Sequence, residues 1–195
     1  QDEPYTCELL QRNGLLSPAK GSTLRVISVA YTRARILLRD VPLECHPQKG
    51  LATEVHLVIP ELGTFEKAVA IHAALIGHYP AGERINLWLA SSASHSSLLN
   101  DFPGIKRCVN LRLIGENGID SIQDISSEAR DGALVTIMAT HLLPEDGYLQ
   151  TLRFRERWSP KNSFRIVLSG PLADGEAIVT SADDLVVAPQ LTGLA

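Results

Sequence analysis

A short basic segment and a downstream Asp-x-Ser sequence carry the residue types that suit recognition of a phosphate-bearing ligand. An arginine fork binds a phosphate through two parallel hydrogen bonds, and its plane also stacks on an aromatic base. An aspartate accepts hydrogen bonds from base N–H groups, a serine hydroxyl donates to phosphate oxygens, and a glycine lets the backbone approach a ligand closely. Residues of these types are Lys106, Arg107 and Arg112 in the basic segment, and Asp124, Ser126 and Gly132 downstream.

Sequence patterns for catalysis or metal binding are weaker than those for binding of a phosphate-bearing ligand. None of the six histidines lies in a His-Glu-x-x-His motif or a close carboxylate pairing, which disfavours a metal site. Residues 91–97 place serines beside His95, but a Gly-x-Ser-x-Gly elbow is absent, so we interpret them as a polar loop before a short helix at 94–101. Residues 115–118 lack a dinucleotide fingerprint and a Walker lysine, and they predict a hairpin turn. The sequence therefore predicts no catalytic residue, no metal and no cofactor.

Composition and charge narrow the class of protein. The 195 residues include 18 Lys+Arg and 22 Asp+Glu, giving a formal net charge of −4, and 45% are hydrophobic. This balance argues against a nucleic-acid partner, since such domains are usually strongly basic. No uncharged apolar run reaches the roughly 18–20 residues that a membrane span needs. Three cysteines without a Cys-x-x-Cys pair indicate reduced thiols, and residues 1–4 lack signal-peptide character, so we expect a cytoplasmic protein.

The two halves of the chain resemble each other at an offset of 97 residues. Pro47 and Gly50 recur as Pro144 and Gly147, and each turn leads into a strand-like stretch. Short alternating stretches follow at roughly 8–12-residue spacing, which is typical of small barrels. We therefore predict an all-β protein of two small β-barrels in tandem with short helices, at residues 1–103 and 104–195.

Residues 64–77 allow two interpretations. Thr64 is a suitable N-cap, alanine is frequent and Gly77 could end a helix, which would make residues 54–90 a β-α-β unit of an α/β fold. The repeat, however, aligns residues 67–71 with 164–168, which have the pattern of a strand. On that basis we favour a strand. The tail at 185–191 is either a last strand or a docking segment.

The barrel pattern, the Asp-Ile-Ser sequence at 124–126 and its basic lead-in resemble the PilZ family. This resemblance implies six-stranded barrels and binding of the bacterial messenger cyclic di-GMP through an R-x-x-x-R segment and a [D/N]-x-S-x-x-G motif. The ligand-binding residues that it implies are Lys106, Arg107, Arg112, Asp124, Ser126 and Gly132. Arg107 and Arg112 are five residues apart rather than four, and Ala129 stands at the motif's glycine position. In the first half only Ser28 matches the motif, as in the non-binding modules of flagellar-brake proteins.

The function that the resemblance implies is bacterial signalling. The chain would regulate motility, secretion or exopolysaccharide through a protein partner, and cyclic di-GMP would bind in the second module. The resemblance also allows an oligomer. Three alternatives stay open: a degenerate PilZ-like adaptor that binds no nucleotide, a jelly-roll coat protein, and an α/β transferase built on the β-α-β interpretation.

Overall fold

The computed structural model describes residues 28–46, 50–76, 83–114, 125, 127–139, 162–169 and 185–188. Three α-helices and a 3-10 helix are described: α2 (Val29–Asp40), α3 (Thr64–Ile76), α4 (Ser92–Asp101) and η2 (Pro103–Arg107). Two short strands, β1 (Cys45–His46) and β2 (Gly50–Leu51), form an antiparallel pair. The main sheet contains β3 (Val55–Ile59), β4 (Ile85–Leu89), β5 (Val109–Leu113), β6 (Leu134–Ala139), β7 (Ser163–Ser169) and β8 (Leu185–Ala188).

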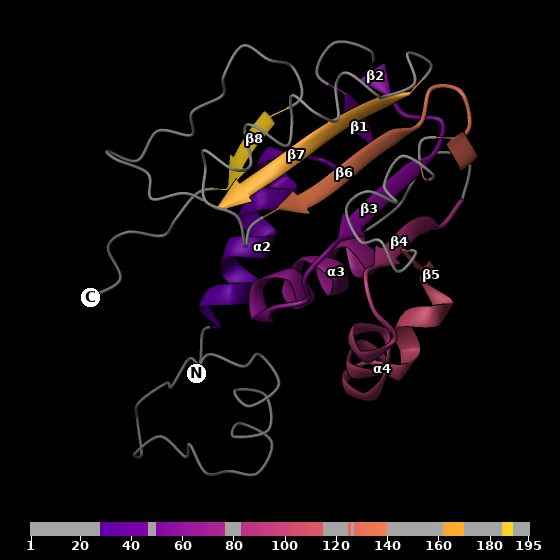
Figure 1. The fold of residues 1–195 in the computed structure, drawn as a ribbon. Helices are drawn as coiled ribbons and strands as arrows, with labels where there is room; N and C mark the ends of the chain where they lie inside the picture. Colours follow the sequence, from indigo (N-terminus) through magenta and orange to yellow (C-terminus); the bar gives the residue numbers. More distant parts are fainter. Residues whose placement is uncertain are drawn as a thin grey trace, which may run out of the picture.

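The six-stranded sheet is parallel throughout, in the order β5-β4-β3-β6-β7-β8 (Figure 1). The chain begins in the centre at β3, moves outward through β4 to the edge at β5, and then returns to place β6 on the other side of β3. Leu57 is paired with Leu87 of β4 and Thr136 of β6. All five residues of β3 are buried, as expected for a central strand covered on both faces.

One face of the sheet is covered by the helices α2, α3 and α4, which Figure 1 shows gathered along one side. Ser28 and Ser91 start α2 and α4, because each side chain accepts a hydrogen bond from the amide three residues later. α2 packs along α3. The larger core combines residues from these helices with strand residues of the same face, including Leu57, Leu87 and Met138.

The opposite face of the sheet has a second, smaller core. Val58, Trp88, Ile137 and Phe164 supply the strand side of this core, and Ile114 and Ile125 pack with them. Along β3, the side chains of this face alternate with those of the larger core, following the two-residue period of a strand. The sheet thus has a separate core on each face, and α2, α3 and α4 cover the larger one, which is an α/β arrangement.

The prediction of an all-β protein with two tandem barrels is wrong: the fold is α/β. The decisive error is at residues 64–76, which form helix α3 and not a strand. α3 lies against both the sheet and α2, and five of its residues at 68–71 and 73 are buried. A helix buried on most of its circumference has no clear 3.6-residue polar pattern, so its sequence resembles a buried strand.

The repeat that supported the barrels does not correspond to equivalent elements. Residues 67–71 lie in α3, whereas 164–168 lie in β7. Ser28, the only remnant of the ligand motif in the first half, is the N-cap of α2. Strand β5, which the sequence assigned to a second copy beginning at residue 104, pairs with β4. Strands on both sides of the expected boundary thus share one sheet.

Several local predictions are confirmed. Residues 55–59, 85–89 and 109–113 are strands, and the β-α-β alternative for residues 54–90 matches β3, α3 and β4. The short helix expected at 94–101 is α4, and the tail contains strand β8. None of the helices in the described ranges combines the length and apolar character that crossing a membrane requires.

Candidate functional site

The strand order singles out the carboxyl edge of the sheet between β3 and β6. In an open parallel sheet, ligands bind outside the carboxyl ends of the strands at the point where the chain reverses its direction of progress across the sheet. Here that point lies between β3 and β6, because β4 and β5 continue to one side and β6, β7 and β8 to the other. On the β3 side, residues 60–63 lead from the strand into α3.

The loop after β3 ends at Gly63, where α3 begins. The Lys67 amide donates to the Gly63 carbonyl at 3.0 Å, which starts the helical hydrogen bonding. The Glu66 carboxylate folds back over the glycine: a Cβ on residue 63 would lie 2.6 Å from Glu66 Oε2. A carboxylate in the first helical turn is favourable because it faces the positive end of the helix dipole. The edge therefore already holds a negative charge where a ligand phosphate would approach α3.

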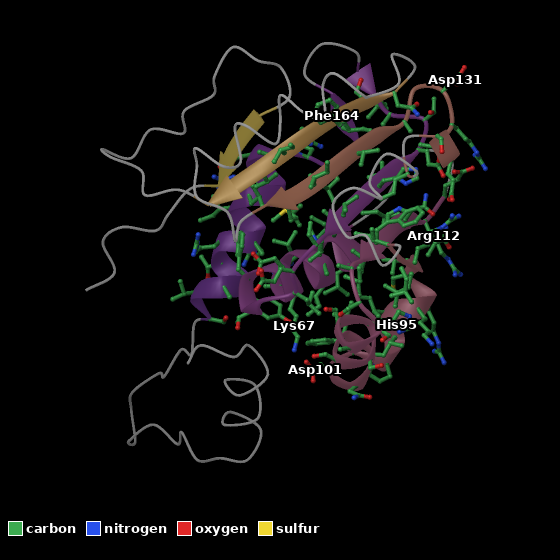
Figure 2. All side chains as sticks on the ribbon, viewed as in Figure 1. Lys67, His95, Asp101, Arg112, Asp131 and Phe164 are labelled. Atoms are coloured by element: carbon green, nitrogen blue, oxygen red, sulfur yellow. The ribbon has the colours of Figure 1, made fainter. Side chains whose placement is uncertain are left out.

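The neighbouring edge position, after β4, is lined by hydroxyl groups. Ser91 Oγ accepts from the Ser94 amide at 3.1 Å and donates to Ser94 Oγ at 3.0 Å. The His95 amide donates to the Ser91 carbonyl at 3.0 Å, so Ser91 and Ser94 form the cap and first turn of α4. The polar loop predicted at 91–97 is therefore wrong beyond Ser91, because α4 already begins at Ser92. Lys67 of α3 and Asp101 of α4 form an ion pair at 2.6 Å that joins the two helices (Figure 2).

A second group of polar side chains lies on the smaller-core face, toward the amino ends of β3, β4 and β5. Trp88 Nε1 donates to His56 Nδ1 at 3.0 Å. His56 Nε2 lies 3.1 Å from Glu54 Oε2, although the N–H does not point along a hydrogen-bond direction. Glu54 also accepts from Asn86 Nδ2 at 2.9 Å and from the Arg130 amide at 3.0 Å. We call Glu54, His56, Asn86 and Trp88 the Glu54–Trp88 network.

The ionisation of this network is set by burial and by its internal contacts. Burial lowers the pKa of His56, and the nearby Glu54 carboxylate only partly opposes that effect. Burial also raises the pKa of Glu54, but hydrogen bonds from the Arg130 amide and Asn86, together with the contact to His56, outweigh this effect and leave the pKa below its usual value. The stable state near pH 7 is therefore a carboxylate beside a neutral imidazole.

The Glu54–Trp88 network is a structural assembly and not a catalytic one. Both imidazole nitrogens of His56 face groups of the protein, the indole N–H on one side and the Glu54 carboxylate on the other. His56 is also only 2% exposed. A general base needs a ring nitrogen within reach of a substrate proton. Both nitrogens instead contact side chains of the protein, Trp88 on β4 and Glu54 next to β3, so the network fixes the packing of these two strands.

Four of the six candidate ligand-binding residues, Lys106, Arg107, Arg112 and Gly132, lie in the described part of the chain. Lys106 and Arg107 are exposed on η2. Arg112 lies on β5, where its guanidinium sits 5.2 Å above the Trp88 ring and bonds to Glu128 at 3.2 Å (Figure 2). Asp124 and Ser126 lie outside the described residues. Arg112 thus has structural partners that account for its position.

Gly132 also has a structural explanation. It lies in the turn before β6 with a φ of 82°, a conformation that favours glycine. A Cβ at this position would approach the Thr53 side chain at 3.2 Å, and the Thr53 amide donates to the Gly132 carbonyl. The turn before β6 therefore requires glycine at this position, and its hydrogen bond with Thr53 links the start of β6 to the start of β3.

The sequence missed the pairing of His56 with Glu54. The two residues are separated by one position, and residues at i and i+2 of a strand share a face, so the spacing itself carried the signal. The prediction that no histidine has a close carboxylate partner is wrong at this position. Over the described ranges, no group of three or more His, Cys, Asp or Glu side chains is arranged to hold a metal ion. The chain matches no family model, no curated protein and no solved structure.

Proposed function

We propose that the chain is a nucleotide-binding module of the doubly wound α/β class, with its ligand at the carboxyl edge between β3 and β6. The observation that carries the proposal is the strand order β5-β4-β3-β6-β7-β8 in a wholly parallel sheet. Numbered from the central strand, this is the order 3-2-1-4-5-6, which in other proteins binds dinucleotides across the crevice at the chain reversal. The proposal rests on fold-level analogy combined with the geometry of this edge.

The side chains at the carboxyl edge narrow the range of ligands that the site can bind. The loop before α3 has a single glycine, Gly63, in place of the Gly-x-Gly-x-x-Gly pattern that cradles a pyrophosphate. The Glu66 carboxylate beside it disfavours a phosphate against the first turn of α3. The end of β4 offers hydroxyls from Ser91 and Ser94 and no carboxylate for a ribose diol. A ligand with few phosphates near α3 suits this edge better than a dinucleotide held in the usual way.

We infer a binding role and not a catalytic one. The described part of the carboxyl edge holds the Ser91 and Ser94 hydroxyls and the carboxylates of Glu61 and Glu66. Its Lys67–Asp101 ion pair joins α3 to α4. A cytoplasmic location and a protein partner also belong to the proposal; Cys45 and Cys108, both free thiols, fit a reducing compartment. Cyclic di-GMP stays in the set of ligands to be tested.

The test is calorimetric titration of the chain with S-adenosylmethionine, ATP, NAD⁺, NADPH and cyclic di-GMP. Two matched variants place the site: Gly63→Leu puts a side chain at the carboxyl edge, whereas Gly104→Leu puts the same side chain into open space on η2. We expect saturable binding of at least one nucleotide, lost in Gly63→Leu and retained in Gly104→Leu.

A charge variant at the same edge checks the role of Glu66. Glu66→Gln removes the carboxylate but keeps a side chain of the same length, so phosphate-bearing ligands are expected to bind several-fold more tightly and S-adenosylmethionine is not. Absence of binding by every ligand, or binding that Gly63→Leu leaves unchanged, would overturn the proposed site.

A further inference from the structure

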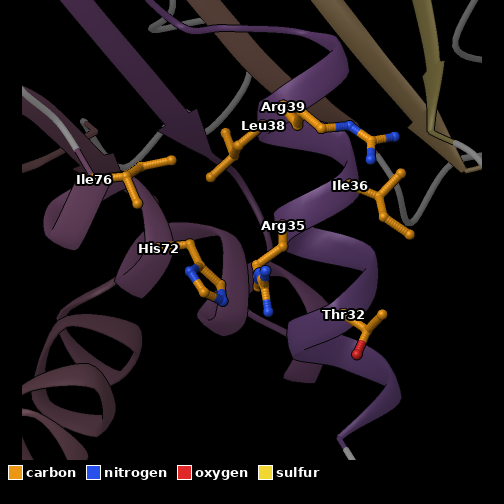
Figure 3. Close-up of a pocket in the computed structure, with 7 residues that line it drawn as sticks. All are labelled: Thr32, Arg35, Ile36, Leu38, Arg39, His72 and Ile76. Carbon is orange, nitrogen blue, oxygen red and sulfur yellow. The ribbon is translucent and has the colours of Figure 1, made fainter.

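A pocket of about 410 Å³ lies on the helical layer, separate from the carboxyl edge, between α2 and α3 (Figure 3). Its volume is within the range of small-molecule sites. The residues that line it are Thr32, Arg35, Ile36, Leu38, Arg39, His72 and Ile76. None of these seven side chains is acidic, whereas two are arginines and one is a histidine.

Arg35 and His72 form the polar wall of the pocket. They extend from facing helices toward the same space, as Figure 3 shows. Burial and the neighbouring Arg35 charge together lower the pKa of His72. His72 Nε2 is buried and has no hydrogen-bond partner among the described residues. Arg35 likewise has no ion pair or hydrogen bond within the described part of the chain, so both groups retain donors or acceptors for a ligand.

Arg39, the other arginine that lines the pocket, differs from Arg35 because it has an ion-pair partner. It bonds to the adjacent Asp40 at 2.7 Å, so its charge is already compensated. Arg35, one turn earlier on the same helix, has no such neighbour in the described residues. The uncompensated positive charge in the pocket is therefore concentrated at Arg35, beside the imidazole of His72.

The remaining wall is apolar. Leu38 is buried at the back of the space between the helices, and Ile36 and Ile76 extend the apolar lining. Ile76 is 55% exposed at the end of α3, although it is a large aliphatic side chain. Exposed aliphatic surface beside an uncompensated cation suits a ligand that carries one charged group and one apolar part.

We propose that the pocket between α2 and α3 binds a small amphipathic anion, with its carboxylate or phosphate group between Arg35 and His72 and its apolar part against Leu38 and Ile76. The guanidinium supplies charge-assisted hydrogen bonds to the anion, and the His72 Nε2 atom supplies or accepts one more. Covering Leu38 and Ile76 removes apolar surface from water, which adds to the affinity.

The test is titration of the full chain with octanoate and with octyl phosphate, each followed by calorimetry. The two probes share the apolar chain and differ in the anion, so their relative affinity identifies the preferred charged group. Octanol has the same alkyl chain without a charge and so tests the contribution of the anionic group. Acetate and inorganic phosphate carry the charge without a long alkyl chain and so test the contribution of the apolar part. The variants are Arg35→Gln and Ile76→Ser at the pocket, with Arg107→Gln on η2 as the matched control for loss of one surface arginine.

We expect saturable binding of one equivalent of octanoate or octyl phosphate and much weaker binding of octanol, acetate and phosphate. Loss of a hydrogen bond to a charged group typically weakens binding about tenfold or more, so Arg35→Gln should show that loss, whereas Arg107→Gln should not. Ile76→Ser, at an exposed position, should weaken binding several-fold without affecting folding. Equal binding of octanol, or equal affinities of the Arg35→Gln and parent chains, would overturn the proposal.

Discussion

Replacing His56 with leucine should destabilise the protein because it leaves a buried indole N–H without an acceptor. Trp88 Nε1 donates to His56 Nδ1 at 3.0 Å, and the two residues are only 6% and 2% exposed. An unsatisfied buried donor costs about 1–3 kcal/mol, and leucine offers no acceptor in its place. We therefore expect the His56→Leu variant to lose about 1–3 kcal/mol in free energy of unfolding, measured by urea denaturation followed by far-ultraviolet circular dichroism.

A double-mutant cycle isolates this hydrogen bond from the packing of the two rings. Trp88→Phe removes the donor, so the double variant has neither an orphaned N–H nor an orphaned acceptor. Removing both partners of a buried hydrogen bond costs less than the sum of the single losses. The expected coupling energy is about 1 kcal/mol or more, and additive losses would show that the hydrogen bond does not stabilise the fold.

The same network makes stability depend on pH in a defined direction. The folded state holds the pKa of His56 below the ordinary value of 6.5, so between the two pKa values the unfolded chain binds more protons. The stabilising effect is complete above about pH 6.5 and decreases as pH falls below it, by at most about 1.4 kcal/mol per pH unit for one histidine. Glu54, whose pKa is also lowered, adds a further loss only below about pH 4.5.

His72, whose pKa is lowered as well, should contribute to the same pH dependence. Unfolding free energies at pH 7.5 and 5.5 are compared for the parent chain, His56→Leu and His72→Leu. Each substitution should flatten the pH dependence, because each removes one group that protonates more easily in the unfolded chain. A His56→Leu slope equal to that of the parent would refute the assignment of a neutral, buried imidazole.

Three further substitutions test single contacts by the same denaturation assay. Gly132→Ala should cost about 1–2 kcal/mol, because the residue has a φ of 82°, and a loss near zero would contradict the strained turn. Arg165, whose pKa burial lowers to about 10, bonds to Thr136 and the Pro42 carbonyl, so Arg165→Lys, which cannot span both, should cost about 1–3 kcal/mol. Asp101→Asn, at a partly exposed ion pair, should cost less than about 1 kcal/mol, with the cost vanishing at high salt.

The sequence predicted the positions of strands β3, β4 and β5 correctly, but it did not predict that they lie side by side in one parallel sheet. The strands at 55–59, 85–89 and 109–113 were predictable because β-branched and aliphatic residues concentrate there between turns. Whether such strands close a barrel or lie parallel in an open sheet depends on the connections between them. The connection at 64–76 was decisive, and its burial against both the sheet and α2 removed the polar stripe that normally identifies a helix.

The sequence of the central strand β3 contained a signal for a parallel sheet. β3 is buried at all five positions, and four of its residues are apolar in the run Val-His-Leu-Val-Ile. A nearly continuous apolar run is typical of a parallel strand covered on both faces, whereas a barrel wall that faces water should alternate. His56 interrupts the run and imitates alternation, but its imidazole is buried by Trp88 and Glu54.

The candidate site could not be predicted from residue types alone. Arg112 and Gly132 have the chemistry of ligand contacts, yet one stacks over Trp88 and pairs with Glu128, and the other makes a turn. Arg35, which has no hydrogen bond or ion pair among the described residues, stood in the sequence near Arg33 without any motif. Its significance comes from packing, since only the contact of α2 with α3 places His72 and Ile76 around it.

The amino and carboxyl edges of the sheet differ in how their polar groups are hydrogen-bonded. Toward the amino ends, the Glu54–Trp88 network, the Gly132 turn and the Arg130–Glu83 ion pair at 2.6 Å bind these side chains to one another. Such mutual satisfaction stabilises the fold but leaves little for a ligand. At the carboxyl edge, Gly63 and the serines before α4 present backbone and hydroxyl groups next to the chain reversal. A ligand that binds this sheet therefore gains most at the carboxyl edge, which is why the matched glycine variants test the proposal directly.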